Sequence, residues 1–206
     1  MTITIANGPL SPTPPATANY TLDGPKNKIL FSPFPRRVRA GFGGEIILDT
    51  QAGMLLHESG LLPALYVPVT DIRSDLLTKT KHTTHCRYKG DASYWTIVAN
   101  GQSSENAVWG YETPVESAAF IHGYMALYWD RVDQWHDEDE EVLGHLCDPY
   151  HRVDIRPTSR LVTASIDRVV VAESTAAFVL SETGLPNRYY IPEADVRAEL
   201  FTTSNT

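Results

Sequence analysis

The chain has 206 residues, of which 42% are hydrophobic and 20% are charged, a composition that is typical of a soluble globular protein. Its formal net charge of -8 opposes binding to a phosphate backbone. The one dense basic run, residues 35–39, is short enough to be a solvated strand end. We therefore expect no nucleic-acid partner.

Membrane and secretory features are missing from the sequence pattern. No stretch approaches the roughly 18 to 20 consecutive apolar residues of a membrane helix, and residues 1–15 lack the basic and apolar regions of a signal peptide. Two cysteines, Cys86 and Cys147, are too few for a disulfide framework in a chain of this size. We expect a cytoplasmic protein with reduced thiols and no membrane partner.

Residues 1–35 contain seven of the fourteen prolines, which fix φ and remove backbone hydrogen-bond donors. This composition predicts an extended or disordered N-terminal arm outside any sheet. Beyond it, short β-prone runs alternate with turns. Gly43-Gly44 and Asn100-Gly101 each separate two such runs and suit two-residue hairpins, whose central residues need positive φ. The sequence therefore predicts a mainly β fold of antiparallel strands.

Helical structure is expected in only a few places. Residues 114–120 predict a short helix, and Asp71 and Asp195 each predict a single turn after a Tyr-x-Pro strand. The acidic run at residues 135–143 is a further helix candidate, and a solvated face is its other interpretation. Residues 136–150 are then an acidic connector.

An internal repeat with an offset of 124 residues organises the chain. Without a gap, "LLHESGLLPALYVPVTDIRSDLLT" at 55–78 matches "VLSETGLPNRYYIPEADVRAELFT" at 179–202. Each copy predicts a strand, a glycine turn and a Tyr-x-Pro strand, followed by an Asp that can bond the backbone ahead of the next strand. We expect one complete domain at 36–135 and a half repeat of the same strands at 151–206.

Several longer motifs within residues 37–135 resemble one family. The run "E-x-G…Y-x-P-x-x-D-[IV]-R…T-T-H-C-x-Y-K-G-x-A-S-Y-W…E-N-A-x-W-x-Y…G-Y-x-A-x-Y-W-D-R" resembles domain of unknown function 427. Some members of that family carry two such domains in tandem, and "DPYHRVDI" at 148–155 resembles their connection. The resemblance implies a β-tent, in which two antiparallel sheets meet at an angle.

The resemblance implies neither a bound metal nor a particular reaction for this chain. The similar tents of the cereblon ligand domain hold zinc with four cysteines, whereas this chain has two, so we expect no metal and no cofactor. The family is also labelled nucleotidyltransferase-like. This sequence lacks a Gly-Ser turn followed by an Asp-x-Asp pair, and nucleotidyl transfer needs carboxylates for Mg²⁺.

The segment 83–135 belongs to the first copy alone, and we expect the chemistry there. Residues kept in both copies, such as Glu58 and Asp71, most simply serve the geometry of turns and strands. At the start of the unique segment, "HTTHCRYKGDASYW" at 82–95 gathers two imidazoles, a thiol and an amine.

Four interpretations of this opening loop stay open. His82, His85 and Cys86 could ligate a metal. Cys86 could be a nucleophile, because a nearby cation favours the thiolate. His85 could act as an acid or base while Lys89 stabilises an oxyanion. The polar groups could also simply satisfy one another. Since both His85 and Lys89 are taken to lie outside the core, replacing either with Ala should change stability by less than about 1 kcal/mol.

The aromatic residues predict a pocket. Tyr94 and Trp95 fall on opposite faces of one strand, while Trp109 and Tyr111 share a face. A small β domain cannot easily bury every ring, so one cluster is expected to line an open pocket; the alternative is that all the rings belong to the core. The predicted ligand-binding residues are Tyr94, Trp95, Glu105, Asn106, Trp109 and Tyr128.

Two functions follow as expectations. The first is a metal-independent small-molecule enzyme that uses His85, Lys89 and Cys86 beside an aromatic-lined cleft, and the second is a non-catalytic small-ligand binding or interaction module that uses the same cleft. A half repeat near 56 residues is too small to be stable alone. We expect it to pack on the open sheet of the first domain, with pairing across a two-fold axis as the alternative, so that the protein is a monomer or a homodimer.

Overall fold

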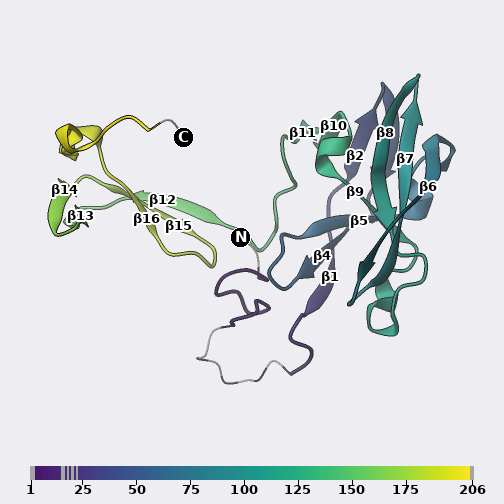
Figure 1. The fold of residues 1–206 in the computed structure, drawn as a ribbon, viewed down its shortest axis with the longest axis horizontal. Helices are drawn as coiled ribbons and strands as arrows, with labels where there is room; N and C mark the ends of the chain where they lie inside the picture. Colours follow the sequence, from purple (N-terminus) through teal and green to yellow (C-terminus); the bar gives the residue numbers. More distant parts are fainter. Residues whose placement is uncertain (1–2, 15–16, 18, 20, 22, 205–206) are drawn as a thin grey trace.

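The computed structural model describes residues 3–14, 17, 19, 21 and 23–204, and it consists mainly of antiparallel strands (Figure 1). One sheet has the order β1-β4-β5-β9-β8-β7-β6, and a second has the order β11-β10-β2-β3. The strands of the larger sheet are β1 (Ile29–Pro33), β4 (Met54–Glu58), β5 (Ala64–Pro68), β6 (Leu77–Cys86), β7 (Gly90–Ala99), β8 (Gln102–Gly110) and β9 (Tyr124–Leu127). Those of the smaller sheet are β2 (Val38–Phe42), β3 (Glu45–Thr50), β10 (Gln134–Asp137) and β11 (Glu140–Glu141).

Both predicted hairpins are confirmed. Gly43 and Gly44 connect β2 to β3 with φ angles of 58° and 81°, and Asn100 and Gly101 connect β7 to β8 with φ angles of 47° and 78°. Positive φ at both central residues is the geometry of the tight hairpin turn that matches strand twist.

The larger sheet carries a hydrophobic cluster on each face. The first cluster takes residues from both sheets and includes Leu55, Trp95 and Trp135. The second lies on the opposite face and includes Leu56 and Tyr94, covered by the short helix η3 (Glu116–Ile121). Because successive side chains of a strand point to opposite faces, the neighbours Tyr94 and Trp95 fall into different clusters, as the sequence predicts.

The predicted N-terminal arm is wrong at its end, because residues 29–33 form β1 and pair with β4. Pro33 is compatible with this strand, since β1 is at the edge of the sheet, where proline is tolerated. Further upstream, the amide of Gly60 donates to the carbonyl of Thr4 at 2.8 Å, so the first residues fold against the turn after β4. Positions 1–2, 15–16, 18, 20 and 22 of the predicted arm lie outside the described residues.

Helical structure is confined to short 3-10 turns in the described part of the chain. The predicted helix near residues 114–120 is η3, and the predicted turns at Asp71 and Asp195 are η1 (Val69–Asp71) and η5 (Glu193–Asp195). The remaining turns are η2 (Ser74–Leu76), η4 (Trp129–Arg131) and η6 (Ala198–Leu200). None of the described helices is long and apolar enough to cross a membrane.

The acidic run at 135–143 is not a helix. It forms the hairpin of β10 and β11, in which Trp135 pairs with Ala40 and buries its ring, and Glu138 turns the chain with a φ of 53°. The tertiary pairing of β10 with β2 thus determines the structure of this segment.

The half repeat reproduces the first strands of the domain. Its strands begin 124 residues after β1 to β5, and η5 and η6 follow at the same offset from η1 and η2. They form one sheet in the order β12-β15-β16 and a β13-β14 hairpin. The strands are β12 (Val153–Pro157), β13 (Val162–Ile166), β14 (Val169–Ser174), β15 (Phe178–Glu182) and β16 (Arg188–Tyr190).

The shared Asp of each copy has a structural role. The Thr50 hydroxyl donates to Asp71 at 2.6 Å and accepts from the amide of Ala52 at 3.0 Å. In the half repeat, the Ser174 hydroxyl donates to Asp195 at 2.5 Å in the same arrangement. The Asp therefore orients a hydroxyl, and this hydroxyl accepts a hydrogen bond from the backbone. The sequence instead predicts a direct hydrogen bond between the Asp and the backbone ahead of the next strand.

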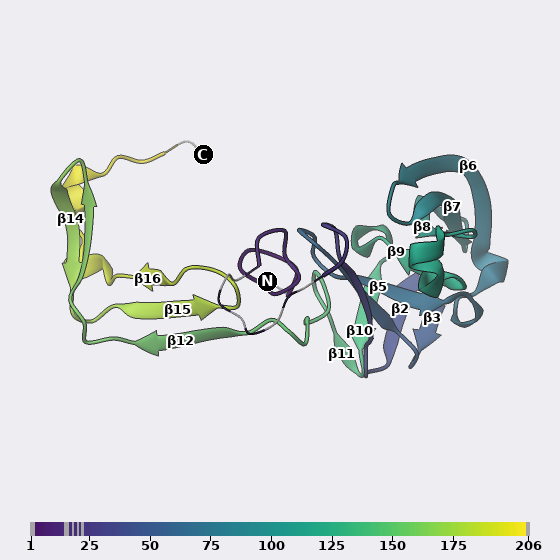
Figure 2. The ribbon, with the colours of Figure 1, turned by 90° about the horizontal axis from the view of Figure 1, so that it is seen from below.

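The half repeat does not pack on the open sheet of the first domain. Strands β12 to β16 lie apart from β1 to β11 in two perpendicular views (Figures 1 and 2). The size argument predicts that the segment needs a partner, but the identity of that partner was predicted wrongly.

Candidate functional site

Two β-bulges lie on either side of β7. In β6, residues 80–82 lie opposite the single residue Tyr94, because Lys79 pairs with Trp95 and Thr83 with Ser93. In β8, residues 105–107 lie opposite the single residue Thr96. Extra residues in a strand interrupt its pairing and change the direction of its side chains. Both bulges fall beside the same short stretch of β7.

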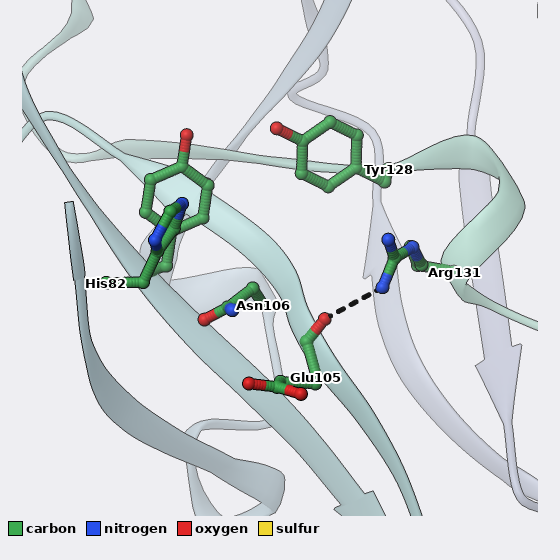
Figure 3. A pocket seen from close by; sticks show the side chains of 6 residues that line it. His82, Glu105, Asn106, Tyr128 and Arg131 are labelled. Carbon is green, nitrogen blue, oxygen red and sulfur yellow. Dashed lines mark hydrogen bonds between the residues drawn. The ribbon is translucent and has the colours of Figure 1, made fainter. Parts of the chain in front are cut away.

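A pocket with a volume of about 320 Å³ lies where the two bulges approach one another. Figure 3 shows His82 on one side of it, Tyr128 and Arg131 on the other, and Asn106 and Glu105 between them. The guanidinium of Arg131 donates to the carbonyl of Glu105 at 3.1 Å, which ties the segment after β9 to the bulge of β8. The residues that line the pocket are His82, Tyr94, Glu105, Asn106, Tyr128 and Arg131.

Asn106 has a φ of 52°, a left-handed conformation that is unusual for a residue other than glycine and that is often found at functional sites. The side-chain oxygen of Asn106 accepts a hydrogen bond from the Thr80 hydroxyl at 2.7 Å. The backbone N–H of Asn106 donates a hydrogen bond to the Thr96 hydroxyl at 3.3 Å. The first bond holds the side chain of Asn106, and the second holds its backbone. Among the described residues, no protein group accepts from its side-chain NH₂, which leaves two donors for a ligand.

Aromatic rings form the walls of the pocket. The ring of His82 lies 4.4 Å from that of Tyr94, and the ring of Tyr128 lies 4.4 Å from that of Trp109. Burial, with a smaller contribution from the hydrogen bond to Tyr94, raises the pKa of Tyr128 to about 12. Tyr128 therefore stays protonated near neutral pH and can donate a hydrogen bond from the pocket wall.

Lys89 lies elsewhere, beside the second hydrophobic cluster, with its ammonium 6.0 Å from the centre of the Tyr111 ring. Its ammonium donates to the carboxylate of Glu58, and both side chains are at least nine-tenths buried. The other oxygen of Glu58 accepts from the amide of Asn27 at 2.9 Å. Burial raises the pKa values of the neighbouring Tyr66 and Tyr111 above their ordinary value. The charge of Lys89 is thus neutralised inside the protein, and the expectation that this residue lies outside the core is wrong.

His85 and Cys86 end strand β6 and do not form a loop, which corrects the expected position of both. The imidazole of His85 contacts the carboxylate of Asp91 at 2.6 Å, and both side chains are about three-quarters exposed. Cys86 is half-buried against the second cluster. Because His85 contacts Asp91 in solvent while Lys89 contacts Glu58 in the core, the predicted acid/base pair is not assembled at one site.

The structure places four of the predicted ligand-binding residues around the pocket and two of them elsewhere. Tyr94, Glu105, Asn106 and Tyr128 surround the pocket. Trp95 instead belongs to the core between the two sheets. Trp109 lies behind Tyr128, with its ring also 6.4 Å from that of Tyr66.

Two pocket residues were not predicted as ligand-binding residues. The sequence suggests His82 only as a metal ligand, and Arg131 only as the last residue of the quoted family motif. The sequence gives a signal for His82, since a polar residue beside aromatic strands is a binding candidate. For Arg131 the signal is its place in the family motif, which does not show that the turn η4 (Trp129–Arg131) brings it to the pocket.

We expect purified protein to contain no stoichiometric zinc and to keep its thermal midpoint in EDTA. In the described residues no three His, Cys, Asp or Glu side chains gather as metal ligands would, and Cys86 is half-buried while Cys147 is exposed. Elemental analysis by mass spectrometry checks this expectation. One tightly held ion per chain would contradict it.

Comparison with protein families identifies one family for this chain. The model of the family described as domain of unknown function (DUF427) matches residues 30–138 and again residues 154–206. The two matches cover the complete domain and the half repeat, and the chain therefore belongs to this family. No curated protein matches the chain.

Proposed function

We propose that this member of the DUF427 family binds a small polar organic molecule in the pocket between the two bulges. The observation that carries the proposal is the convergence of both bulges on one pocket, together with the left-handed conformation of Asn106 at its centre. Neither feature is needed to pair the strands, and bulges are over-represented beside functional sites.

The lining groups define the ligand class. A volume of about 320 Å³ is at the lower end of the range for small-molecule sites, which suits a ligand of metabolite size. Glu105 and Arg131 bring opposite charges, so the pocket suits a neutral or zwitterionic molecule. The rings of His82 and Tyr128 suit a planar group between them, and the NH₂ of Asn106 suits a carbonyl or carboxylate oxygen.

An acid/base enzyme is the second candidate, and one observation favours it. His82 lines the pocket, and histidine is the side chain whose charge changes most readily near neutral pH. In this version His82 takes the acid/base role that the sequence suggested for His85. Turnover of a bound compound that is lost in His82→Gln, with binding retained, would favour the enzyme over the binding module.

Removing single polar groups from the pocket should weaken ligand binding by about tenfold each, because a hydrogen bond contributes about 1 kcal/mol, and more when one partner is charged. The variants are Asn106→Gly and Arg131→Ala. Glycine adopts positive φ without strain, so Asn106→Gly removes the amide and keeps the backbone of the bulge. The measurement is calorimetric titration with hits from a set of small neutral and zwitterionic ring compounds.

The matched control is Arg87→Ala, which removes an exposed arginine near the end of β6 that does not line the pocket. It should leave binding unchanged. Compounds that bind the wild type and the two pocket variants with equal affinity would contradict the proposal.

A further inference from the structure

The hydroxyl of Thr80 joins the two bulges beside the pocket. Thr80 is the first residue of the β6 bulge, and its oxygen accepts a hydrogen bond from the backbone N–H of His82, in the same bulge, at 3.2 Å. The same hydroxyl lies 2.7 Å from the side-chain oxygen of Asn106, in the bulge of β8. Thr80 is not one of the residues that line the pocket, so any effect on a ligand passes through these neighbours.

The proton of the Thr80 hydroxyl has one acceptor in good geometry. A hydroxyl donates a single hydrogen bond. Among the described residues, the acceptor within reach besides Asn106 is the carbonyl of Tyr94, at 3.4 Å. That contact is longer than the ordinary O–H···O range of roughly 2.5–3.0 Å. The Thr80 proton therefore lies between Thr80 and Asn106.

This proton determines the orientation of the Asn106 carboxamide. A donor from Thr80 requires the amide oxygen, which leaves the NH₂ group for the pocket, where Asn106 lies between the two walls (Figure 3). With the carboxamide turned over, the NH₂ group would face the Thr80 oxygen, and the hydroxyl proton would have only the distant carbonyl of Tyr94. Thr96 holds the backbone N–H of Asn106 separately, so Thr80 acts on the side chain.

We propose that Thr80 is a positioning residue that sets the hydrogen-bond polarity of the pocket. Because it holds the oxygen of Asn106, the site selects a ligand with an acceptor oxygen at this position over a ligand of the same shape with a donor there. A donor would face the NH₂ group, and an unmade hydrogen bond of this kind opposes binding. This inference rests on the proposed function and adds the specificity of the same site.

The other polar groups of the pocket do not make this selection. The carboxylate of Glu105 is an acceptor and the guanidinium of Arg131 is a donor, so the charged groups together favour neither kind of ligand. The hydroxyl of Tyr128 can donate or accept. The polarity at the centre of the pocket therefore depends on Asn106 and, through it, on Thr80.

Two neutral ring compounds of matched size test the selection. Pyridine N-oxide presents an acceptor oxygen, and aniline presents an NH₂ donor. NMR titration of the full chain near neutral pH measures both affinities. We expect the wild type to prefer pyridine N-oxide, and we expect Thr80→Val, which keeps the shape without the hydroxyl, to lower the ratio of the two affinities by roughly fivefold. Thr80→Ser keeps the hydroxyl and should retain the ratio of the wild type.

The matched control is Thr83→Val, on the same strand. The Thr83 hydroxyl donates to the carbonyl of Ala92 at 2.9 Å, and Thr83 does not line the pocket. This variant should leave the ratio of affinities unchanged. A ratio that stays the same in Thr80→Val, or that falls equally in Thr83→Val, would overturn the role of Thr80 while ligand binding in the pocket stands.

The side-chain amide of Asn106 gives a readout that needs no ligand. Nitrogen relaxation of its NH₂ group reports how rigidly the carboxamide is held. We expect an ordered group in the wild type and in Thr80→Ser and a clearly more mobile one in Thr80→Val. Equal order in the wild type and Thr80→Val would overturn the role of Thr80 whether or not a compound binds. The expected loss of order, together with binding of neither compound, would support that role and contradict the proposed function alone.

Discussion

Lys89→Ala is expected to lower the free energy of unfolding by about 3–5 kcal/mol, because removing one partner of a buried ion pair leaves the other charge without compensation. The Glu58 side chain is 8% exposed, and among the described residues its carboxylate would keep only the hydrogen bond from the side-chain amide of Asn27. Urea unfolding followed by tryptophan fluorescence measures the effect. All four tryptophans lie between residues 95 and 135, so this signal reports on the complete domain alone.

Two further variants separate the buried pair from a general effect of losing a lysine. Lys79 forms an exposed ion pair with Glu112, and Lys79→Ala should cost less than about 1 kcal/mol. The double variant Glu58→Gln with Lys89→Met should recover much of the loss, since apolar or neutral replacements of a buried pair are often tolerated. Equal costs for Lys89→Ala and Lys79→Ala would show that the buried pair has no special role in stability.

Tyr66→Ala is the other substitution with a large expected effect, about 3–5 kcal/mol, the range seen when a buried aromatic side chain is removed. The ring of Tyr66 is almost wholly buried and lies 6.0 Å from that of Phe31 and 6.4 Å from that of Trp109. Urea unfolding with the tryptophan signal measures the loss.

Tyr190→Ala is the matched control, because it removes the same side chain at the equivalent position of the half repeat. Strand β16, which ends at Tyr190, lies apart from the complete domain (Figure 1), so the tryptophan transition should stay where it is in the wild type. A shift of similar size in both variants would mean that the half repeat supports the complete domain after all.

Local turn chemistry and the repeat made much of the fold predictable. Gly43-Gly44 and Asn100-Gly101 require positive φ, and few arrangements other than a tight hairpin satisfy that requirement. The offset of 124 residues then placed the strands of the half repeat. The segment 135–143 was harder to predict, because its strands depend on pairing with β2, which is distant in sequence.

Four of the six residues that line the pocket are predicted from the sequence as ligand-binding residues, but their arrangement is not. Alternation along β7 separated Tyr94 from Trp95 correctly, since the side-chain period of a strand is two. The bulges interrupt that period in β6 and β8, and a bulge depends on the register between strands rather than on one strand's pattern. Motif spacing also could not show that Lys89 faces Glu58, which is 31 residues earlier in the chain.

The half repeat shows a related limit. Its small size predicts correctly that its strands cannot bury all their apolar residues, and Phe178 and Tyr190 are indeed about half exposed. Size alone, however, does not identify the surface that covers them. The comparison of β16 with β5 shows which edge and face of the half repeat are left open, and that comparison requires the sheet topology.

Chemical-shift mapping of the full chain by NMR with a bound ring compound from the screen tests the central claim most directly. If the pocket between the bulges is the ligand site, the largest shifts will cluster at residues 80–82, 104–106 and 128–131, and in Asn106→Gly they will need about tenfold more compound to reach saturation. Shifts centred on His85 to Asp91, with the pocket residues unchanged, would contradict the account and return the site to the end of β6.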